Sequence, residues 1–158
     1  MNASELMTKA VSTCFAEDNL EHAAQIMWEH DCGAVPVVDQ AHHVVGMITD
    51  RDIAMAAYTQ GRPLHDIPVS ATMARRIYAV GEGDPLETVE AVMKRARIRR
   101  VPVLDGDGRL TGILSVSDLA RHTHRASGRK GNGLSSDSVA QTLAAISEPG
   151  PAQSSAPS

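Results

Sequence analysis

Aromatic residues are scarce in this 158-residue chain, which has one Trp, one Phe and two Tyr. So few rings make a poor platform for stacking single-stranded bases. The formal net charge of -4 also argues against a protein that grips phosphates along a polynucleotide, because such proteins carry a strongly basic face. We therefore expect no nucleic-acid partner.

Long apolar runs are also missing. No stretch approaches the roughly 18 apolar residues of a membrane span. Residues 1–9 lack the basic, apolar and small-residue regions of a secretory signal. Since 42% of the residues are hydrophobic, the chain can still bury a real core. We expect a soluble cytoplasmic protein without a membrane partner.

Cysteine and clustered metal ligands are sparse too. Cys14 and Cys32 are the only cysteines, so their number excludes a disulfide framework and a four-cysteine zinc site. They are either ordinary thiols in a reducing cytosol or the two halves of a regulatory bridge. The pairs His42-His43 and His122-x-His124 do not share a helical face and lack a third ligand, so we predict no metal site.

Charge is unevenly distributed along the chain. Residues 1–72 carry 3 basic and 10 acidic side chains, whereas residues 73–130 carry 12 basic and 7 acidic ones. A dense basic run lies in the second segment and consists of Lys94, Arg95, Arg97, Arg99 and Arg100. This run could hold an anion, or it could be a solvated helix face.

The chain is internally duplicated. At an offset of 66 residues, residues 7–54 align with residues 73–120 without a gap, and 12 of the 48 positions are identical. Five of these identities are Val35-Pro36-Val37 with Val101-Pro102-Val103, and the glycine and aspartate of the turns that follow, Gly46 and Asp52 with Gly112 and Asp118. The sequence therefore consists of two copies of one unit, with a connector and a tail.

Each copy has the same predicted order, β-α-β-β-α. Asp18 and Asp84 each precede a Glu by three residues, so we predict that they cap the helices that follow. Apolar residues at helical spacing continue each helix, and Gly33 is predicted to end the first one in a left-handed conformation. Two short apolar runs then form a β-hairpin, and a short strand near Val11 or Ile77 begins each unit.

We divide the chain into six parts on this basis: unit 1 (5–60), a connector (61–72), unit 2 (73–125), a linker (126–137), a C-terminal helix (138–148) and a disordered tail (149–158). A unit of this size buries too little surface alone, so the two should pack sheet against sheet about a pseudo-twofold axis. The predicted class is α+β, with two equivalent clefts between the copies.

The turn Gly46–Asp52 and its copy Gly112–Asp118 place a hydroxyl and a carboxylate three residues apart at a helix start. The structural interpretation is a capping box. The functional interpretation is that the helix N-terminus and the hydroxyl hold a phosphate, while the carboxylate accepts hydrogen bonds from a ribose. Both can hold at once, because a carboxylate has several lone-pair sites.

The gap-free duplication, the two Val-Pro-Val strands and the Gly-x-x-Thr/Ser-x-x-Asp turns together resemble a tandem CBS (cystathionine β-synthase) domain pair, or Bateman module. The resemblance covers about residues 5–125. The segments Thr49–Ile53 and Arg99–Val103 resemble those of stand-alone bacterial pairs of the hypoxic-response type. The resemblance to tandem CBS pairs implies a fold of two β-α-β-β-α CBS units. It also implies that these units bind AMP, ADP or ATP, or sometimes S-adenosylmethionine, as a regulatory ligand rather than a required cofactor.

The resemblance also assigns residues. It implies ribose binding by Asp52 and Asp118, with the family's hydroxyl at Thr49 and Ser115 and phosphate or ribose contacts at Arg51 and Ser117. It places phosphate-neutralising groups at Arg99 and Arg100. The adenine surfaces are Ser12, Cys32 and Gly33 for the Asp118 site, and Tyr78 and Ile98 for the Asp52 site. Because Gly33 stands where the second copy has Arg99, the two clefts should differ chemically.

The leading hypothesis is a ligand-sensing regulatory module whose adenosine nucleotide alters its own association or that of a regulated protein partner. The resemblance further implies a homodimer. The alternative is a CBS-fold dimerisation or interaction scaffold that binds no ligand. We expect no enzyme, because nothing in the sequence places a nucleophile beside a base.

Overall fold

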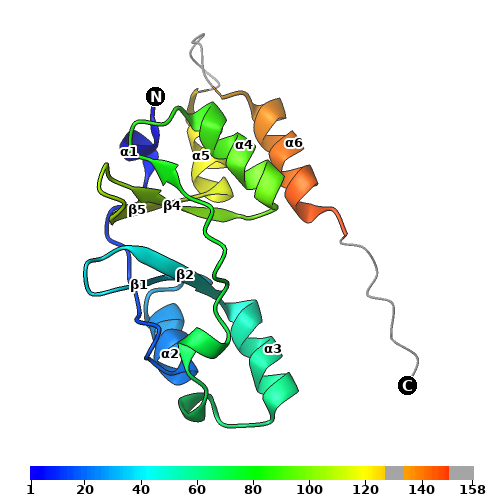
Figure 1. The fold of residues 1–158 in the computed structure, drawn as a ribbon. Coiled ribbons are helices and arrows are strands. Elements are labelled where there is room, and N and C mark those ends of the chain that lie inside the picture. Colours follow the sequence, from blue (N-terminus) through cyan, green and yellow to red (C-terminus); the bar gives the residue numbers. More distant parts are fainter. Residues whose placement is uncertain (127–133, 150–158) are drawn as a thin grey trace.

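The computed structural model describes residues 1–126 and 134–149. Two small β-sheets face each other across the middle of the molecule, and helices cover the outer side of each sheet (Figure 1). The helices and strands confirm the predicted α+β class. None of the helices in these two ranges is long and apolar enough to cross a membrane.

The first unit contains α2 (Leu20–Glu29), β1 (Ala34–Val38), β2 (Val44–Thr49) and α3 (Asp50–Gln60). β1 and β2 form an antiparallel hairpin in which Val35 pairs with Ile48. All five residues of β1 are buried, as expected for a short apolar run covered on both faces. The short 3-10 turns η1 (Leu64–Asp66) and η2 (Val69–Ala71) close this unit.

The second unit contains β3 (Val80–Gly81), α4 (Leu86–Ala96), β4 (Arg100–Leu104), β5 (Leu110–Ser115) and α5 (Val116–Ala126). Its hairpin has the same register as the first, with Val101 paired to Leu114. The predicted order β-α-β-β-α is present in this unit, whereas the first unit has a single bridge in place of the predicted opening strand, and neither pairing lies at Val11 or Ile77 itself. The parallel pairing occurs three residues later, at β3 in this unit and at a single bridge between Cys14 and Val37 in the first.

The start of each copy crosses to the other copy's sheet. Thr8 pairs with Ile113 of β5, and Ala74 pairs with Met47 of β2. The short helix α1 (Ala3–Leu6) accordingly packs with the second unit's core, to which Ala3 belongs.

Because each copy starts on the other copy's sheet, the predicted units do not each pack their own residues. Met7 packs against the second core, whereas Met73 belongs to the first. The predicted connector at 61–72 also supplies the fully buried Ile67 and Val69 to the first core. Each unit is therefore completed by chain on the far side of the predicted boundary, because those apolar side chains have their partners there.

The predicted helix caps are partly wrong. Asn19, not Asp18, caps α2 by accepting a hydrogen bond from the His22 N–H at 2.9 Å. Asp18 and Asp84 instead close the preceding turns, where each accepts a 2.8 Å hydrogen bond from a backbone N–H three residues earlier. The N-cap of α4 is Pro85, which has no side-chain hydrogen bond to offer.

The end of α2 also differs from the prediction. Asp31 takes the left-handed conformation (φ 49°) that was predicted for Gly33, and Arg97 does the same after α4 (φ 56°). Gly33 has another role, because a Cβ there would lie 3.0 Å from the Asp50 carboxylate. Its small size therefore makes room for the first residue of α3.

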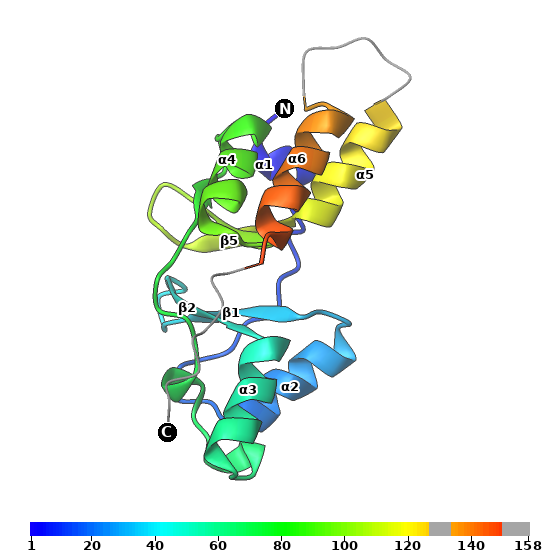
Figure 2. The same cartoon turned by 90° about the vertical axis from the view of Figure 1, so that its right-hand side faces the viewer.

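The C-terminal helix α6 spans Ser136–Ser147 and starts two residues before the predicted position. It lies over α4 and α5 and covers the helical side of the second unit (Figure 2). Glu90 of α4 is buried beneath it and accepts hydrogen bonds from Ser138 at 2.5 Å and Thr142 at 3.0 Å. The predicted linker and tail fall largely at 127–133 and 150–158, outside the described residues.

Candidate functional site

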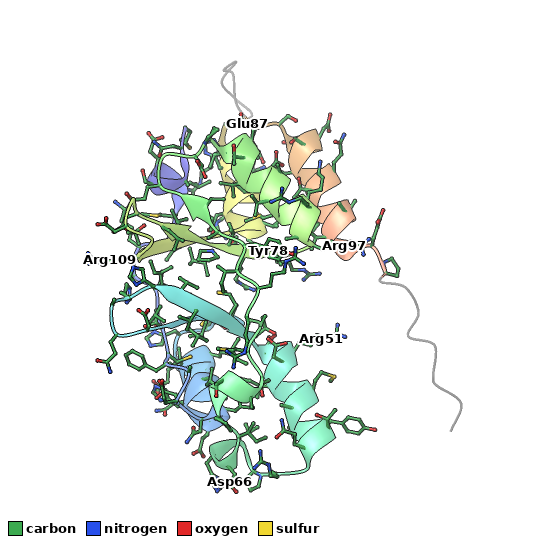
Figure 3. The ribbon with its side chains drawn as sticks, viewed as in Figure 1. Arg51, Asp66, Tyr78, Glu87, Arg97 and Arg109 are labelled. Carbon is green, nitrogen blue, oxygen red and sulfur yellow. The ribbon has the colours of Figure 1, made fainter. Side chains whose placement is uncertain are left out.

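Two clefts are lined by residues of both units. The larger, called here the Asp52 cleft, has a volume of about 1040 Å³ and includes the first turn of α3. The smaller, called the Asp118 cleft, has a volume of about 440 Å³ and includes the first turn of α5. In Figure 3, Tyr78 and Arg97 lie at the edge of the second unit that faces Arg51 of the first.

Both clefts contain a capping box. In the Asp52 cleft, the Thr49 hydroxyl accepts a hydrogen bond from the Asp52 N–H at 3.1 Å, and Asp52 Oδ2 accepts one from the Thr49 N–H at 2.9 Å. Ser115 and Asp118 repeat this arrangement at 3.2 and 2.8 Å. The structural interpretation of the motif is therefore confirmed, and it fixes where each carboxylate points.

The two carboxylates differ in their remaining oxygen. Asp118 Oδ1 forms an ion pair with Arg121 on the next turn of α5. The equivalent of Arg121 in the first unit is Met55, which has no charge. Within residues 1–126 and 134–149, Asp52 Oδ1 has no hydrogen-bond partner. The Asp52 carboxylate thus keeps an acceptor available to a ligand, whereas that of Asp118 is already engaged.

Most predicted residues meet in the Asp52 cleft. It is lined by Thr49, Arg51, Asp52, Tyr78, Ile98 and Arg99, together with Arg100 and Cys32, which line both clefts. Gly33 was assigned to the Asp118 cleft, and that assignment is wrong. Gly33 lies in the Asp52 cleft because its backbone is joined to the start of α3 by the hydrogen bond from the Asp50 N–H to the Gly33 carbonyl.

Sequence reasoning missed further members of the Asp52 cleft, among them Arg76, Arg97 and Ile146. The Arg76 guanidinium lies 5.4 Å from the centre of the Tyr78 ring, a cation–π geometry. Arg97 belongs to the basic run noticed in the sequence, so a signal for it existed. Nothing in the sequence pointed to Ile146, which reaches the cleft from the end of α6.

The cleft is rich in arginine. Five arginines line it, with three aspartates: Arg51, Arg76, Arg97, Arg99, Arg100, Asp31, Asp50 and Asp52. Among the described residues, Arg97 is the one member of the five that forms an ion pair, with Glu148. No carboxylate in the described part of the chain pairs with the other four arginines. Such an arrangement suits an anion with several oxygen atoms.

The Asp118 cleft has a different lining. The predicted Ser12, Cys32, Ser115, Ser117 and Asp118 lie there with Arg100. The sequence reasoning missed His30, Asp31 and Arg121. Two arginines and two aspartates balance one another in this smaller space, so it has no comparable excess of positive charge.

The two cysteines are both free. Cys14 is buried in the first core, and its burial, with a smaller contribution from the charge of Asp18, raises its pKa to about 12. A thiol with so high a pKa is a poor nucleophile at neutral pH. Cys32 is partly exposed where it lines the two clefts.

A duplicated α+β module with paired inter-unit clefts defines the class of this protein. The chain belongs to the CBS domain family, whose model matches residues 3–58 and 66–125. Tandem CBS pairs are regulatory modules.

Two curated relatives cover most of the chain. The CBS domain-containing protein YhcV of Bacillus subtilis is 36% identical over 75% of this chain and 83% of its own length. Hypoxic response protein 1 of Mycobacterium tuberculosis is 33% identical over 76% of this chain and 83% of its own length.

Solved structures show the same fold. A crystal structure of Hypoxic Response Protein I with two coordinated zinc ions matches with a TM-score of 0.71 at 32% identity, over 77% of this chain and 98% of that one. The CBS domain pair of MJ0100, solved with 5'-methylthioadenosine and S-adenosyl-L-methionine, also gives 0.71, at 27% identity over 82% and 98%. In the part of this chain that the structure describes, no three His, Cys, Asp or Glu side chains group as metal ligands.

Proposed function

We propose that this protein is a regulatory module that senses an anionic adenosine nucleotide, AMP, ADP or ATP, in the Asp52 cleft. The observation that carries the proposal lies in one cleft: among residues 1–126 and 134–149, one Asp52 oxygen has no hydrogen-bond partner, and four of the five lining arginines have no ion pair. A carboxylate acceptor suits the two ribose hydroxyls, and guanidiniums suit phosphates.

The remaining lining supports the same ligand. The N-terminus of α3, an 11-residue helix, adds the positive end of its dipole beside Thr49 and Arg51. Ile98, Ala34 and Pro102 give apolar surface for an adenine ring. Tyr78, already beneath Arg76, offers the one aromatic face among the described residues that line the cleft.

Charge selects among adenosine ligands. S-adenosylmethionine has a cationic sulfonium where a nucleotide has phosphates, so it gains nothing from the unpaired arginines of this cleft. In the MJ0100 domain pair, that compound and 5'-methylthioadenosine are the bound ligands. We expect the arginine-rich lining here to favour polyphosphates over either of them.

Calorimetric titration of ATP, ADP, AMP and S-adenosylmethionine tests the proposal. Asp52→Ala should weaken ATP binding by about 10- to 100-fold, since hydrogen bonds to a charged group are lost. Asp118→Ala is the matched control, because it removes the equivalent capping carboxylate of the other unit, and it should leave the ATP affinity within about twofold. The proposal is wrong if no nucleotide binds at millimolar concentration or if Asp52→Ala binds as wild type does.

A second candidate, an interaction scaffold, is favoured by one observation. The segment Ile53–Gln60 of α3 has no charged side chain, and its Tyr58 is 85% exposed, while Trp28 on the neighbouring α2 is 88% exposed. Exposed apolar surface of this kind is typical of association. If the protein is a scaffold, no nucleotide changes its oligomeric state or its Tm. If the leading proposal is correct, a nucleotide raises the Tm.

We further propose, from the family resemblance, that the protein forms a homodimer in the cytoplasm and that the nucleotide changes its association with itself or with a regulated partner. Light scattering at tens of micromolar, with and without ATP, measures both parts. A monomer under both conditions would remove the homodimer from the proposal.

A further inference from the structure

The last turn of α6 lies against the Asp52 cleft. Ile146 lines the cleft itself. Two residues later, Glu148 Oε2 lies 2.8 Å from Nη2 of Arg97, which lines the same cleft. Figure 3 shows Arg97 beside the C-terminal end of this helix. The C-terminal helix therefore contributes Ile146 to the lining of the cleft, and Glu148, which directly follows the helix, pairs with an arginine of that lining.

The two ends of α6 are held with different strength. Near its start, Val139 and Thr142 are buried, and Thr142 donates to the buried Glu90. Near its end, the Arg97–Glu148 pair is exposed, with 44% and 67% of the side-chain surfaces accessible. Exposed ion pairs contribute little stability. The last turn is held by the partly buried Ile146 and by this exposed ion pair, so it is the part of α6 that a competing interaction can release most easily.

Glu148 and a ligand phosphate require the same donors. A guanidinium binds a carboxylate or a phosphate through its planar N–H groups. Arg97 now donates to the Glu148 carboxylate, and a second anion placed on Arg97 would lie within a few ångströms of that negative charge. The two anions therefore oppose each other at Arg97.

We propose that Glu148 is an internal competitor of the phosphates and that anion binding in the Asp52 cleft releases the last turn of α6. The inference rests on the proposed function, and it adds the means by which that site is regulated. Linkage makes the effect reciprocal: the ligand loosens the last turn, and loosening the last turn strengthens ligand binding by the same factor. The rest of α6 stays docked, because Glu90 holds it elsewhere.

A double-mutant cycle at Arg97 and Glu148 tests this competition. Glu148→Gln should tighten ATP binding by about two- to fivefold, the scale of one exposed ion pair. In an Arg97→Gln background, Glu148→Gln should have no effect, because the shared donor is absent. Asp137→Asn is the matched control, since it removes one negative charge from the other end of α6, and it should not change the affinity.

Hydrogen exchange of the 143–149 segment gives a second readout. Saturating ATP should speed exchange there by about two- to fivefold and leave the segment around Val139 unchanged. Glu148→Gln should have the same effect without ATP. Three results would each overturn the inference. The first is an equal ATP affinity in wild type and Glu148→Gln, and the second is an equal gain from Glu148→Gln in the Arg97→Gln background. The third is a rate of hydrogen exchange that does not change when ATP is added.

Inorganic tripolyphosphate separates failure of this inference from failure of the proposed function. If tripolyphosphate binds as tightly as ATP, and more tightly in Glu148→Gln, the competition holds and the adenosine proposal is wrong. If ATP binds better than tripolyphosphate but Glu148→Gln changes neither, the nucleotide proposal holds and the competition is wrong. If neither anion binds the wild-type protein, both are wrong.

Discussion

The two clefts have one backbone plan but different charge, because arginines outnumber aspartates in the Asp52 cleft and equal them in the Asp118 cleft. Positions 66 residues apart line corresponding walls, yet the side chains differ at nearly every polar position. The pairs, with the Asp52 cleft first, are Arg51 and Ser117, Arg76 and Ala10, Tyr78 and Ser12, Arg97 and Asp31, and Ile98 and Cys32, of which Asp31 and Cys32 line both clefts. In each pair the Asp52 cleft has the larger or the more basic residue.

The residues that form the turns, strands and helix caps are, in contrast, the same in both copies. Gly46 and Gly112, Pro36 and Pro102, and Asp52 and Asp118 are identical between the copies. These positions fix turns, strands and caps, so a change in either copy would disturb its fold. Most of the other lining positions differ between the copies. The comparison shows that duplication kept the frame and left the two sites free to diverge.

Exchanging the loop after α4 should produce the largest effect. Arg97→Asp with Arg99→Gly gives the second copy the residues that the first copy has at these positions, and Asp31 already shows that an aspartate adopts this left-handed conformation. Loss of two charge-assisted contacts should weaken ATP binding by about 100-fold or more. Calorimetry measures the change.

Lys94→Asp with Arg95→Gln is the control for this exchange. It makes the same change in net charge on exposed residues of α4 that do not line either cleft. Its ATP affinity should therefore stay close to that of wild type. If the control and the loop exchange weaken ATP equally, the difference between the clefts reflects overall charge and not the loop.

The glycines that the two copies share should have similar effects in the two units. Replacing them should change the free energy of unfolding, by less than the loop exchange changes the free energy of ATP binding. An added Cβ at Gly112 would lie 2.7 Å from Met7 Cγ, and one at Gly46 would lie 3.1 Å from Met73 Cγ. Each Gly→Ala change should destabilise the fold by about 1–3 kcal/mol through overpacking, with the larger effect at Gly112. Urea unfolding measures both.

Gly106→Ala provides the matched control, because nothing lies within 4 Å of its added Cβ. It should change the free energy of unfolding by less than about 1 kcal/mol. Combining Gly112→Ala with Met7→Ala should recover part of the loss. Equal stability of Gly106→Ala and Gly112→Ala would contradict the exchange of chain between the units.

The cysteines should give the smallest effect. Cys14 should resist alkylation at pH 8, because burial raises its pKa to about 12 and keeps it protonated and covered. Cys32 should react, and ATP at four times its Kd should slow that reaction about fivefold. Mass spectrometry of the labelled peptides measures each thiol separately.

Asp52→Ala is the control for this protection, since ATP at the same concentration should no longer slow the labelling of Cys32. Cys32 lines both clefts, so its labelling would respond to a ligand in either. Protection that survives Asp52→Ala and disappears in Asp118→Ala would place the nucleotide in the smaller cleft and reverse the comparison.

The features that could be predicted from the sequence are those whose residues are close together both in the sequence and in space. The hairpins and the Thr49–Asp52 and Ser115–Asp118 boxes each depend on residues a few positions apart, and the structure has them. The cap at Asp18 was wrong because Asn19 offers the same chemistry one residue later. A short-range pattern therefore predicts that a polar side chain caps the helix more reliably than it predicts which residue does so.

Long-range placement was harder to predict. The sequence could not indicate that Met7 and Met73 each pack in the other unit, because the identity of the two methionines is the same whichever sheet they reach. It could not show that Gly33 lines the Asp52 cleft, nor that Ile146 and Glu148 approach it from α6. These facts depend on where separate elements dock.

The sequence by itself determined the duplication, the α+β units and the residue types at each helix start, because all of these follow from local pattern and repetition. The tertiary structure alone decided which of the two clefts concentrates the arginines and which carboxylate keeps an acceptor available. It did so because charge in a cleft is the sum over walls from different elements. The net charge of the chain averages over both clefts and therefore says nothing about either one.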